Sequence, residues 1–183
     1  MITVAWILVE CSVALSASLR SHSVALLAFG SDSFIELLSA LIVLAQFGSV
    51  ARLNQRTANR FAAALLFVLT GFVAISSAVA LLNHVRPETS VMGMAITIGA
   101  LVLMPVLARS KRRKARELNN RAMAADATQS AICAYLAAVT LVSLAFNAMF
   151  HISWLDPVAA LGALPLLIVE GRRTWRGESC GCC

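Results

Sequence analysis

Charged residues are scarce in this 183-residue sequence: Asp, Glu, Lys and Arg together make up 13%, whereas ordinary globular chains carry about 25%. Hydrophobic residues make up 60%, and the mean hydropathy is +0.82. Repeats of fixed period and low-complexity tracts are lacking as well. This composition excludes a soluble enzyme, a secreted disulfide-stabilised domain, a disordered chain and a free nucleic-acid binder. The long uncharged runs predict an integral membrane protein instead.

Motifs of the common enzyme classes are also missing. The sequence has no Ser/His/Asp-type set, no glycine-rich phosphate loop and no His-Glu-x-x-His motif, so we expect no enzyme. Its histidines, His22, His84 and His151, fall between apolar runs, where they are either solvated loop residues or groups that help release a metal ion. Glu10 interrupts the first apolar run and no basic residue precedes it, which argues against a cleaved signal peptide.

Six apolar runs are candidates for membrane-spanning helices. Crossing a hydrocarbon core of about 30 Å takes about 20 helical residues, with about 17 as the lower limit. Only the sixth run, which contains Pro165, is shorter than this limit. We expect an all-α bundle of six membrane helices over residues 1–170, followed by a basic, cysteine-rich cytoplasmic tail over 171–183 and no soluble C-terminal domain. The runs are residues 2–19, 24–45, 61–82, 91–107, 122–150 and 155–169.

Basic residues gather in every second connection, which predicts the orientation of the chain. By the positive-inside rule, these connections and both termini lie in the cytoplasm, as in a multi-pass protein of the inner or plasma membrane. Only Arg20 and Arg86 fall on the other side. The dense run 109–121 is interpreted as a cytoplasmic loop near anionic lipid headgroups, and nucleic acid is not an expected partner. The other thirteen of the 15 basic residues are Arg52, Arg56, Arg60, Arg109, Lys111, Arg112, Arg113, Lys114, Arg116, Arg121, Arg172, Arg173 and Arg176.

Two acidic residues lie four apart in the second run. On a helix, Asp32 and Glu36 share one face, with Cβ atoms roughly 6 Å apart. Two like charges so close repel each other unless one carboxyl keeps its proton or a cation lies between them, and oxygen ligands at this spacing suit a divalent metal. The alternative is a capping box, in which Ser33 begins the helix and Glu36 completes the cap. Spacing alone does not decide between the two interpretations.

The fifth run contains a second pair with the same spacing. Gln129 supplies a carbonyl oxygen and Cys133 a thiolate, which makes one hard and one soft candidate ligand. Alternatively, Cys133 is a small buried hydrophobe and Gln129 an inter-helix hydrogen-bonding group. Asp126 is either a further candidate ligand or only an N-cap, with Gln129 completing a capping box.

Three further features carry chemistry of their own. Glu10 lies midway along the first run. There it either lines a metal pathway together with the candidate ligands of the second and fifth runs, or is a neutral, hydrogen-bonded acid. Asp156-Pro157 reads as an N-cap followed by Pro at the first helical position. The tail cysteines form a cluster that can chelate soft metals, the alternatives being an unstructured or a lipid-modified tail. They are Cys180, Cys182 and Cys183.

Together these motifs resemble the cation diffusion facilitator family of divalent-metal transporters over nearly the whole chain. The run SVALLAFGSDSFIE, residues 23–36, is similar to the family's second span, where an acid or His is followed four residues later by an acid. Ala-Asp-Ala at 125–127, with Gln129 and Cys133, is similar to its fifth span, which usually has a His-x-x-x-Asp pair. WLDPVAAL, residues 154–161, is similar to the opening of its sixth span.

The resemblance implies a tetrahedral metal site formed by two residues from each of the second and fifth spans. Here these are Asp32, Glu36, Gln129 and Cys133, within the membrane rather than at its edge. It also implies a homodimer that exchanges a cytoplasmic divalent metal for protons by alternating access. The usual His and Asp of the fifth span are replaced, and the family's usual C-terminal metal-sensing domain has no counterpart, for which the cysteine tail is a minimal substitute.

The function expected from the sequence is therefore proton-coupled efflux of a divalent metal. Carboxylates and thiolates ligate metals only when deprotonated, so ion and protons compete for one site. The ligand set favours Zn²⁺, with Cd²⁺, Co²⁺, Fe²⁺ and Mn²⁺ as further candidates, over Mg²⁺ or Ca²⁺, and no permanently bound cofactor is expected. Two alternatives remain: a non-transporting metal binder or sensor acting through its tail, and an assembly module whose polar pairs only join helices.

Overall fold

The helices account for nearly all of the chain that the computed structural model describes, which is residues 2–47, 55–83, 87–118, 121–150, 152 and 154–176. These residues contain no strand, so the prediction of an all-α bundle is confirmed. Five helices are long and apolar enough to cross a membrane, and α6, whose apolar stretch lies between Asp156 and Glu170, is not among them. The helices are α1 (Ile2–Ser21), α2 (Val24–Phe47), α3 (Gln55–Leu82), α4 (Val91–Glu117), α5 (Arg121–Phe150) and α6 (Leu155–Arg176).

Three helices extend at least six residues past the apolar runs that predict them. The helix α3 begins before its run, while α4 and α6 continue after theirs, as far as Glu117 and Arg176. The prediction of a loop over residues 109–121 is therefore wrong for most of that segment. Its Ala, Arg, Lys and Glu residues are good helix formers, and hydropathy reports only the part of a helix that lies in hydrocarbon. The basic run is thus held on a rigid helix.

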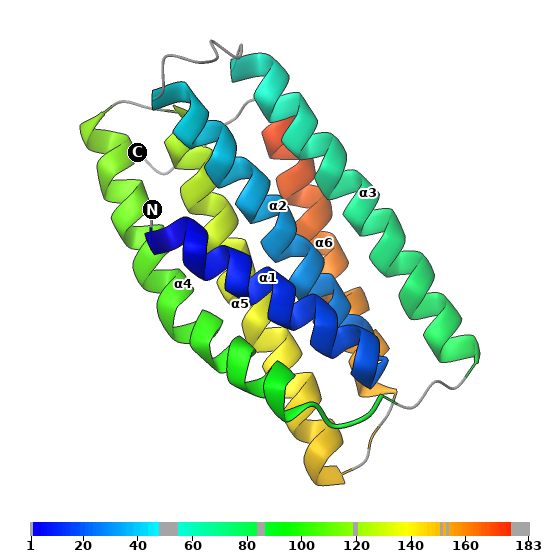
Figure 1. Ribbon diagram of the computed structural model, residues 1–183. Coiled ribbons are helices and arrows are strands. Elements are labelled where there is room, and N and C mark those ends of the chain that lie inside the picture. Colours follow the sequence, from blue (N-terminus) through cyan, green and yellow to red (C-terminus); the bar gives the residue numbers. More distant parts are fainter. Residues whose placement is uncertain are drawn as a thin grey trace.

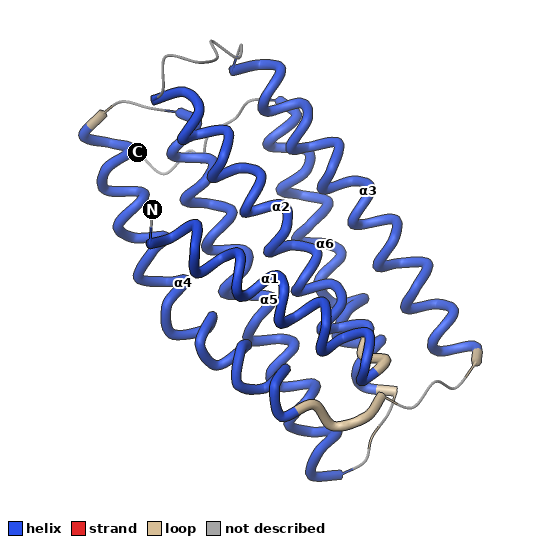
Figure 2. Tube along the Cα trace, in the orientation of Figure 1, coloured by secondary structure: helices blue, strands red, loops and turns tan. Residues whose placement is uncertain are grey.

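Four of the helices form a ring. Contacts join α1 to α2, α2 to α5, α5 to α4 and α4 to α1, so these helices surround a common interior (Figure 1). The remaining two, α3 and α6, pack together beside the ring and touch it through α2 and α5. Figure 2 shows that the helices run roughly side by side. The interior of the ring is where side chains from four different helices can meet.

Glycine allows α1 to approach its neighbours closely. A Cβ atom at Gly30 of α2 would lie 3.0 Å from the backbone nitrogen of Leu15 in α1, and one at Gly99 of α4 would lie 3.0 Å from the Trp6 ring. Small residues at such crossings let helix backbones pack tightly in a membrane, where van der Waals contact replaces the hydrophobic effect. The close fit of α1 places Glu10 at the interior of the ring.

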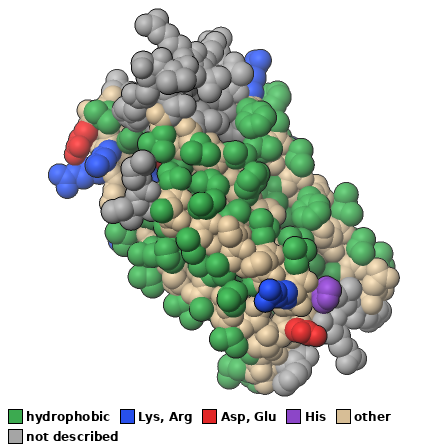
Figure 3. All heavy atoms as spheres, in the orientation of Figure 1, with side chains coloured by type: hydrophobic (Ala, Val, Ile, Leu, Met, Phe, Trp, Pro, Cys, Tyr) green, Lys and Arg blue, Asp and Glu red, His purple; other side chains and the backbone are tan. Residues whose placement is uncertain are grey.

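The surface of the bundle is apolar, whereas many of its buried side chains are polar. Large hydrophobic side chains such as Val68, Ile75, Val102 and Met149 are exposed. In Figure 3 hydrophobic side chains spread over the visible face, and the coloured charged side chains lie toward its ends. This arrangement suits a lipid environment, in which outward side chains must be apolar and polar groups must be satisfied internally.

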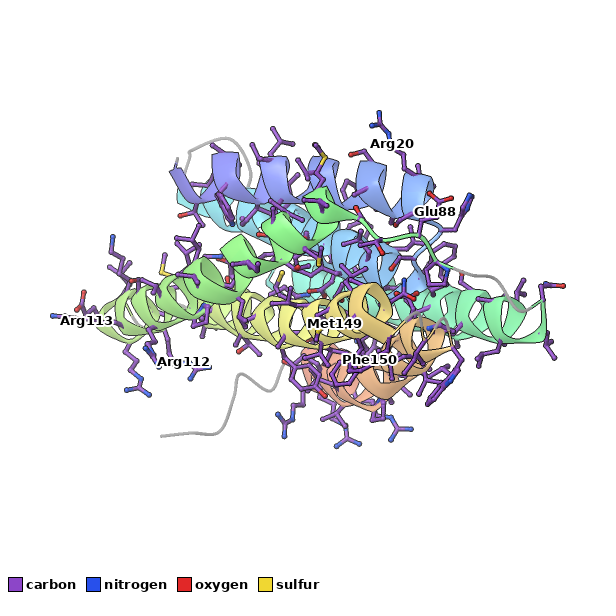
Figure 4. The ribbon with its side chains drawn as sticks, turned by 90° about the horizontal axis from the view of Figure 1, so that it is seen from below. Arg20, Glu88, Arg112, Arg113, Met149 and Phe150 are labelled. Carbon is purple, nitrogen blue, oxygen red and sulfur yellow. The ribbon has the colours of Figure 1, made fainter. Side chains whose placement is uncertain are left out.

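The charged ends of the bundle differ from each other. The last turns of α2, α4 and α6 and the first turns of α3 and α5 lie at the same end (Figure 1), which we call the basic end. Arg112 and Arg113 extend from α4 there, and Arg20 and Glu88 lie at the opposite end (Figure 4). The basic run of α4 and the arginines in the last turns of α6 therefore share one end of the bundle, as the alternating spans predict.

Asp156 caps a helix other than its own. The helix α6 begins at Leu155, so the interpretation of Asp156 as the N-cap of α6 is wrong. Its carboxylate instead accepts hydrogen bonds from the backbone N–H groups of Val24 (2.7 Å) and Ala25 (3.2 Å) at the start of α2. It also accepts from the hydroxyls of Ser23 (2.6 Å) and Ser143 (3.4 Å). Asp156 of α6 therefore links α6 to α2 and α5, and its negative charge interacts favourably with the positive N-terminal end of the α2 dipole.

Replacing Asp156 should destabilise the bundle. Asp156→Ala leaves two backbone N–H groups and two hydroxyls without this acceptor in a buried position, and we expect a loss of about 1–3 kcal/mol in the free energy of unfolding. Glu88→Ala, which removes an exposed carboxylate at the same end, should change it by less than about 0.5 kcal/mol. Thermal unfolding of both variants in detergent measures the difference, and equal stability would contradict the capping role.

Candidate metal site

Nine polar side chains fill the interior of the four-helix ring, and we call them the polar core. All four ring helices contribute, with α2 and α5 supplying most members. Six members have no exposed surface, Asp126 and Gln129 are 4% and 7% exposed, and the Lys111 side chain is 13% exposed. The members are Glu10 of α1, Asp32, Ser33 and Glu36 of α2, Lys111 of α4, and Asp126, Gln129, Ser130 and Cys133 of α5.

Helix boundaries exclude the capping interpretation of the acidic residues in α2 and α5. The helix α2 begins at Val24 and α5 at Arg121, so Asp32, Glu36 and Asp126 lie inside helices rather than at their starts. The capping-box alternatives are therefore wrong. Four-residue spacing places Asp32 and Glu36 on one face of α2, and that face is turned into the ring.

One half of the polar core joins α1, α2 and α5. The amide Nε2 of Gln129 donates a hydrogen bond to Oδ1 of Asp32 (3.2 Å). Glu10 Oε1 accepts from the hydroxyl of Ser33 (2.8 Å) and from the thiol of Cys133 (3.1 Å). Ser33 Oγ also lies 3.7 Å from Cys133 Sγ. The carboxyl groups of Asp32 and Glu10 are thus both in contact with the predicted ligand pair of α5.

The other half of the polar core, nearer the basic end, joins α2, α4 and α5. The ammonium Nζ of Lys111 lies 3.2 Å from Glu36 Oε1 and 3.0 Å from Asp126 Oδ2. It also donates a hydrogen bond to Ser130 Oγ (2.8 Å), and Ser130 in turn donates to Glu36 Oε1. One lysine therefore bridges two buried carboxylates from different helices.

Each of the four carboxyl groups has unused coordinating capacity. Glu10 Oε2, Asp32 Oδ2, Glu36 Oε2 and Asp126 Oδ1 are buried and have no hydrogen-bond partner among the described residues. Buried polar atoms are almost always paired, and a buried charge without a partner is costly. Oxygen atoms of this kind are available to bind a proton or a hard or borderline cation.

The structure brings some of the predicted ligands together and separates others. Asp32 meets Gln129, and Cys133 lies beside Glu10, whereas Glu36 is turned toward Lys111 and Ser130. In the part of the chain that the structure describes, no three His, Cys, Asp or Glu side chains are grouped closely enough to hold one ion. The four residues expected to form one tetrahedral site are all buried in the ring, but they divide between the two halves of the polar core.

Lys111, Ser33 and Ser130 belong to the polar core but are not predicted from the sequence as members of the site. The density of charge around Lys111 predicts an orienting loop, whereas the residue lies on the helical stripe formed by the buried residues Met104, Ala108 and Ala115 of α4. This spacing of four, three and four residues is the signal that could have identified it. The two serines carry no comparable signal, because small residues are common in membrane helices.

Several predicted residues lie outside the core or outside the described residues. The tail cysteines Cys180, Cys182 and Cys183, as well as His84 and His151, are among the residues that the structure does not describe. The helix α6 continues to Arg176, so the first part of the expected tail is helical. His22 lies in the turn between α1 and α2 with a backbone φ of 53°, far along the bundle from the basic end.

Comparison with known proteins agrees with this architecture. A family model described as the cation efflux transmembrane domain matches residues 1–177. No curated protein matches the chain. The family model covers all six helices and every member of the polar core. The resemblance predicted from the motifs in the second, fifth and sixth helices is therefore confirmed, and the chain belongs to the cation efflux family of membrane cation transporters, the cation diffusion facilitators.

Proposed function

We propose that the protein exports a divalent metal cation, with Zn²⁺ or Cd²⁺ as the favoured substrates, in exchange for protons. The observation that carries the proposal is the polar core itself. Asp32 and Glu36 of α2, and Gln129 and Cys133 of α5, are all buried inside the ring, and Gln129 contacts Asp32 directly. Rotation or translation of α2 against α5 by a small amount would let both pairs approach one ion.

The chemistry of these groups supports a borderline or soft metal. A thiolate, carboxylates and an amide oxygen together suit Zn²⁺ and Cd²⁺ better than Mg²⁺ or Ca²⁺, which prefer oxygen ligands alone. Glu10 is within reach of Cys133, so a third helix can add a carboxylate to the set. A pure assembly module would not need four carboxyl groups, each with one oxygen that has no hydrogen-bond partner in the described part of the chain.

The carboxyl oxygens of the polar core also support an exchange of metal for protons. Without metal, buried carboxyl groups are stable only when they are protonated or paired with a cation. A metal ion that binds them and the Cys133 thiolate releases protons, so one site carries either protons or metal. Helices that rock around such a site expose it to each side in turn. The basic end, by the positive-inside rule, faces the cytoplasm, and the family's description as cation efflux supports export.

Asp32 should be essential for transport. In proteoliposomes loaded with a zinc-sensitive dye, we expect Asp32→Ala to lower zinc flux at least about tenfold, because about 1.4 kcal/mol of lost binding suffices for that factor. A pH-sensitive dye in parallel vesicles should report proton movement that disappears with the zinc flux. Glu117→Ala, which removes an exposed carboxylate at the end of α4, is the control and should transport normally. Undiminished flux through Asp32→Ala would rule out the site.

Cys133 should set the preference for soft metals. Replacing its sulfur with oxygen in Cys133→Ser should weaken binding of Cd²⁺ more than binding of Zn²⁺, because Cd²⁺ is the softer ion. Cys11→Ser is the matched control, since Cys11 is also a buried, free cysteine, and the hydrogen bonds of the polar core among the described residues do not include its thiol. Metal competition on the purified proteins measures the ratio of the two affinities. An unchanged ratio in Cys133→Ser would place the thiol outside the site.

Substitutions in the cysteine tail distinguish a transporter from a protein that only binds metal. A transporter whose substrate site lies in the polar core should keep its zinc flux when Cys180, Cys182 and Cys183 are all replaced by Ser. A binder or sensor that works through the tail should lose most of its bound metal in the same variant. Metal content and vesicle flux, measured on the same preparation, distinguish these outcomes, and loss of both together would favour the binder.

A further inference from the structure

Lys111 is the one basic side chain among those described near the end of α4 that is turned into the bundle. Its neighbours in this basic run are exposed, whereas its own side chain is 13% exposed. The stripe that it shares with Ala108 and Ala115 faces the ring, so its inward direction is built into the helix. The exposed neighbours are Arg109, Arg112, Arg113, Lys114 and Arg116.

The Lys111 ammonium occupies a position that suits a divalent cation. It lies between Glu36 of α2 and Asp126 of α5, at 3.2 Å and 3.0 Å from one oxygen of each. Among the described residues, the second oxygens, Glu36 Oε2 and Asp126 Oδ1, have no hydrogen-bond partner. If both acids are ionised, a single positive charge neutralises only one of them. A divalent ion at the same place would neutralise both and would use the free oxygens as ligands.

We propose that Lys111 is a built-in competitor for the transported ion: its ammonium fills the cation position between Glu36 and Asp126 in the metal-free protein, and an entering metal displaces it. This inference rests on the proposed transport function. The displaced side chain has a place to go, because Lys111 starts near the basic end, where a long lysine stem can extend its charge to the headgroup region. Metal binding and release of Lys111 are then one coupled event.

Competition of this kind has two consequences for the transporter. Glu36 is held away from Asp32 and Gln129 by its contacts with Lys111 and Ser130, so releasing Lys111 frees Glu36 to join the other predicted ligands. Moreover, an ion that binds carboxylates weakly, such as Na⁺, gains too little binding free energy to displace the charge-assisted contacts that Lys111 already makes. Lys111 therefore acts as a positioning and specificity residue.

Amine labelling of the wild-type protein tests the displacement directly. Lys111 and Lys114 are the two lysines of the chain, and Lys114 is exposed one turn further along α4. Without metal, an acetylating reagent should modify Lys114 quickly and Lys111 slowly. Saturating Zn²⁺ should raise the rate at Lys111 severalfold and leave Lys114 unchanged, as read by mass spectrometry of the full-length protein's peptides, and Na⁺ at equal ionic strength should change neither. A Lys111 rate that zinc leaves unchanged or lowers would overturn the proposal.

Substitution provides the second test. Lys111→Met keeps the apolar stem but removes the competing charge, so we expect the apparent Kd for Zn²⁺ to fall about tenfold, equivalent to about 1.4 kcal/mol. The matched control Lys114→Met removes an exposed charge of the same helix and should bind zinc like the wild type. A purely structural ion pair predicts the reverse for Lys111→Met, namely lower thermal stability with unchanged or weaker zinc binding.

The outcomes separate this inference from the proposed function. If the wild type transports zinc through Asp32 but labelling of Lys111 does not respond to zinc, only the competitor role is wrong. If purified wild type binds no divalent metal, both proposals are wrong. If Lys111→Met does not fold, the labelling of the wild-type protein decides alone.

Discussion

Every charge inside a lipid-facing bundle must be neutralised within the protein, and this constraint organises the structure. Four carboxyl groups meet inside the ring of α1, α2, α4 and α5, where water is largely excluded. Each uses one oxygen in hydrogen bonds or ion pairs with neighbouring helices, and the other oxygen has no hydrogen-bond partner among the residues that the structure describes. The interior is therefore stable only with protons or cations present, and the same requirement gives a transporter its cargo site.

The helix α2 is the element on which these interactions converge. At its start, Asp156 of α6 and Ser143 of α5 hold the first turn. In its middle, Asp32 and Ser33 contact Gln129 of α5 and Glu10 of α1. Toward the basic end, Glu36 contacts Lys111 and Ser130. The contacts in the middle and at the basic end of α2 involve carboxyl groups of the polar core, which a metal ion can bind. The cap at the start of α2 lies outside the polar core. Binding of an ion can thus alter the middle and basic end of α2 while its first turn stays fixed.

Much of the fold could be predicted from the sequence, because a bilayer limits the choice so strongly. Backbone groups have no water to bind in hydrocarbon, so apolar runs of sufficient length become helices, and six runs became six helices. Positions of helix ends were less predictable. Hydropathy does not detect a charged extension that remains helical, so it predicts an end of α4 before Lys111. The local motif Asp156-Pro157 indicates a helix start but does not show which helix the carboxylate caps.

The candidate site was predictable only in part, for a related reason. Spacing by four residues established that Asp32 and Glu36 share one face of a helix, and likewise Gln129 and Cys133, since that follows from helix geometry alone. The residues that meet across helices depend on rotation and register, which are long-range properties. The tertiary structure alone placed Glu10 beside Cys133 and Lys111 between Glu36 and Asp126. Local sequence therefore determined the helices and the types of ligand, whereas packing of the four-helix ring decided which charges are neighbours.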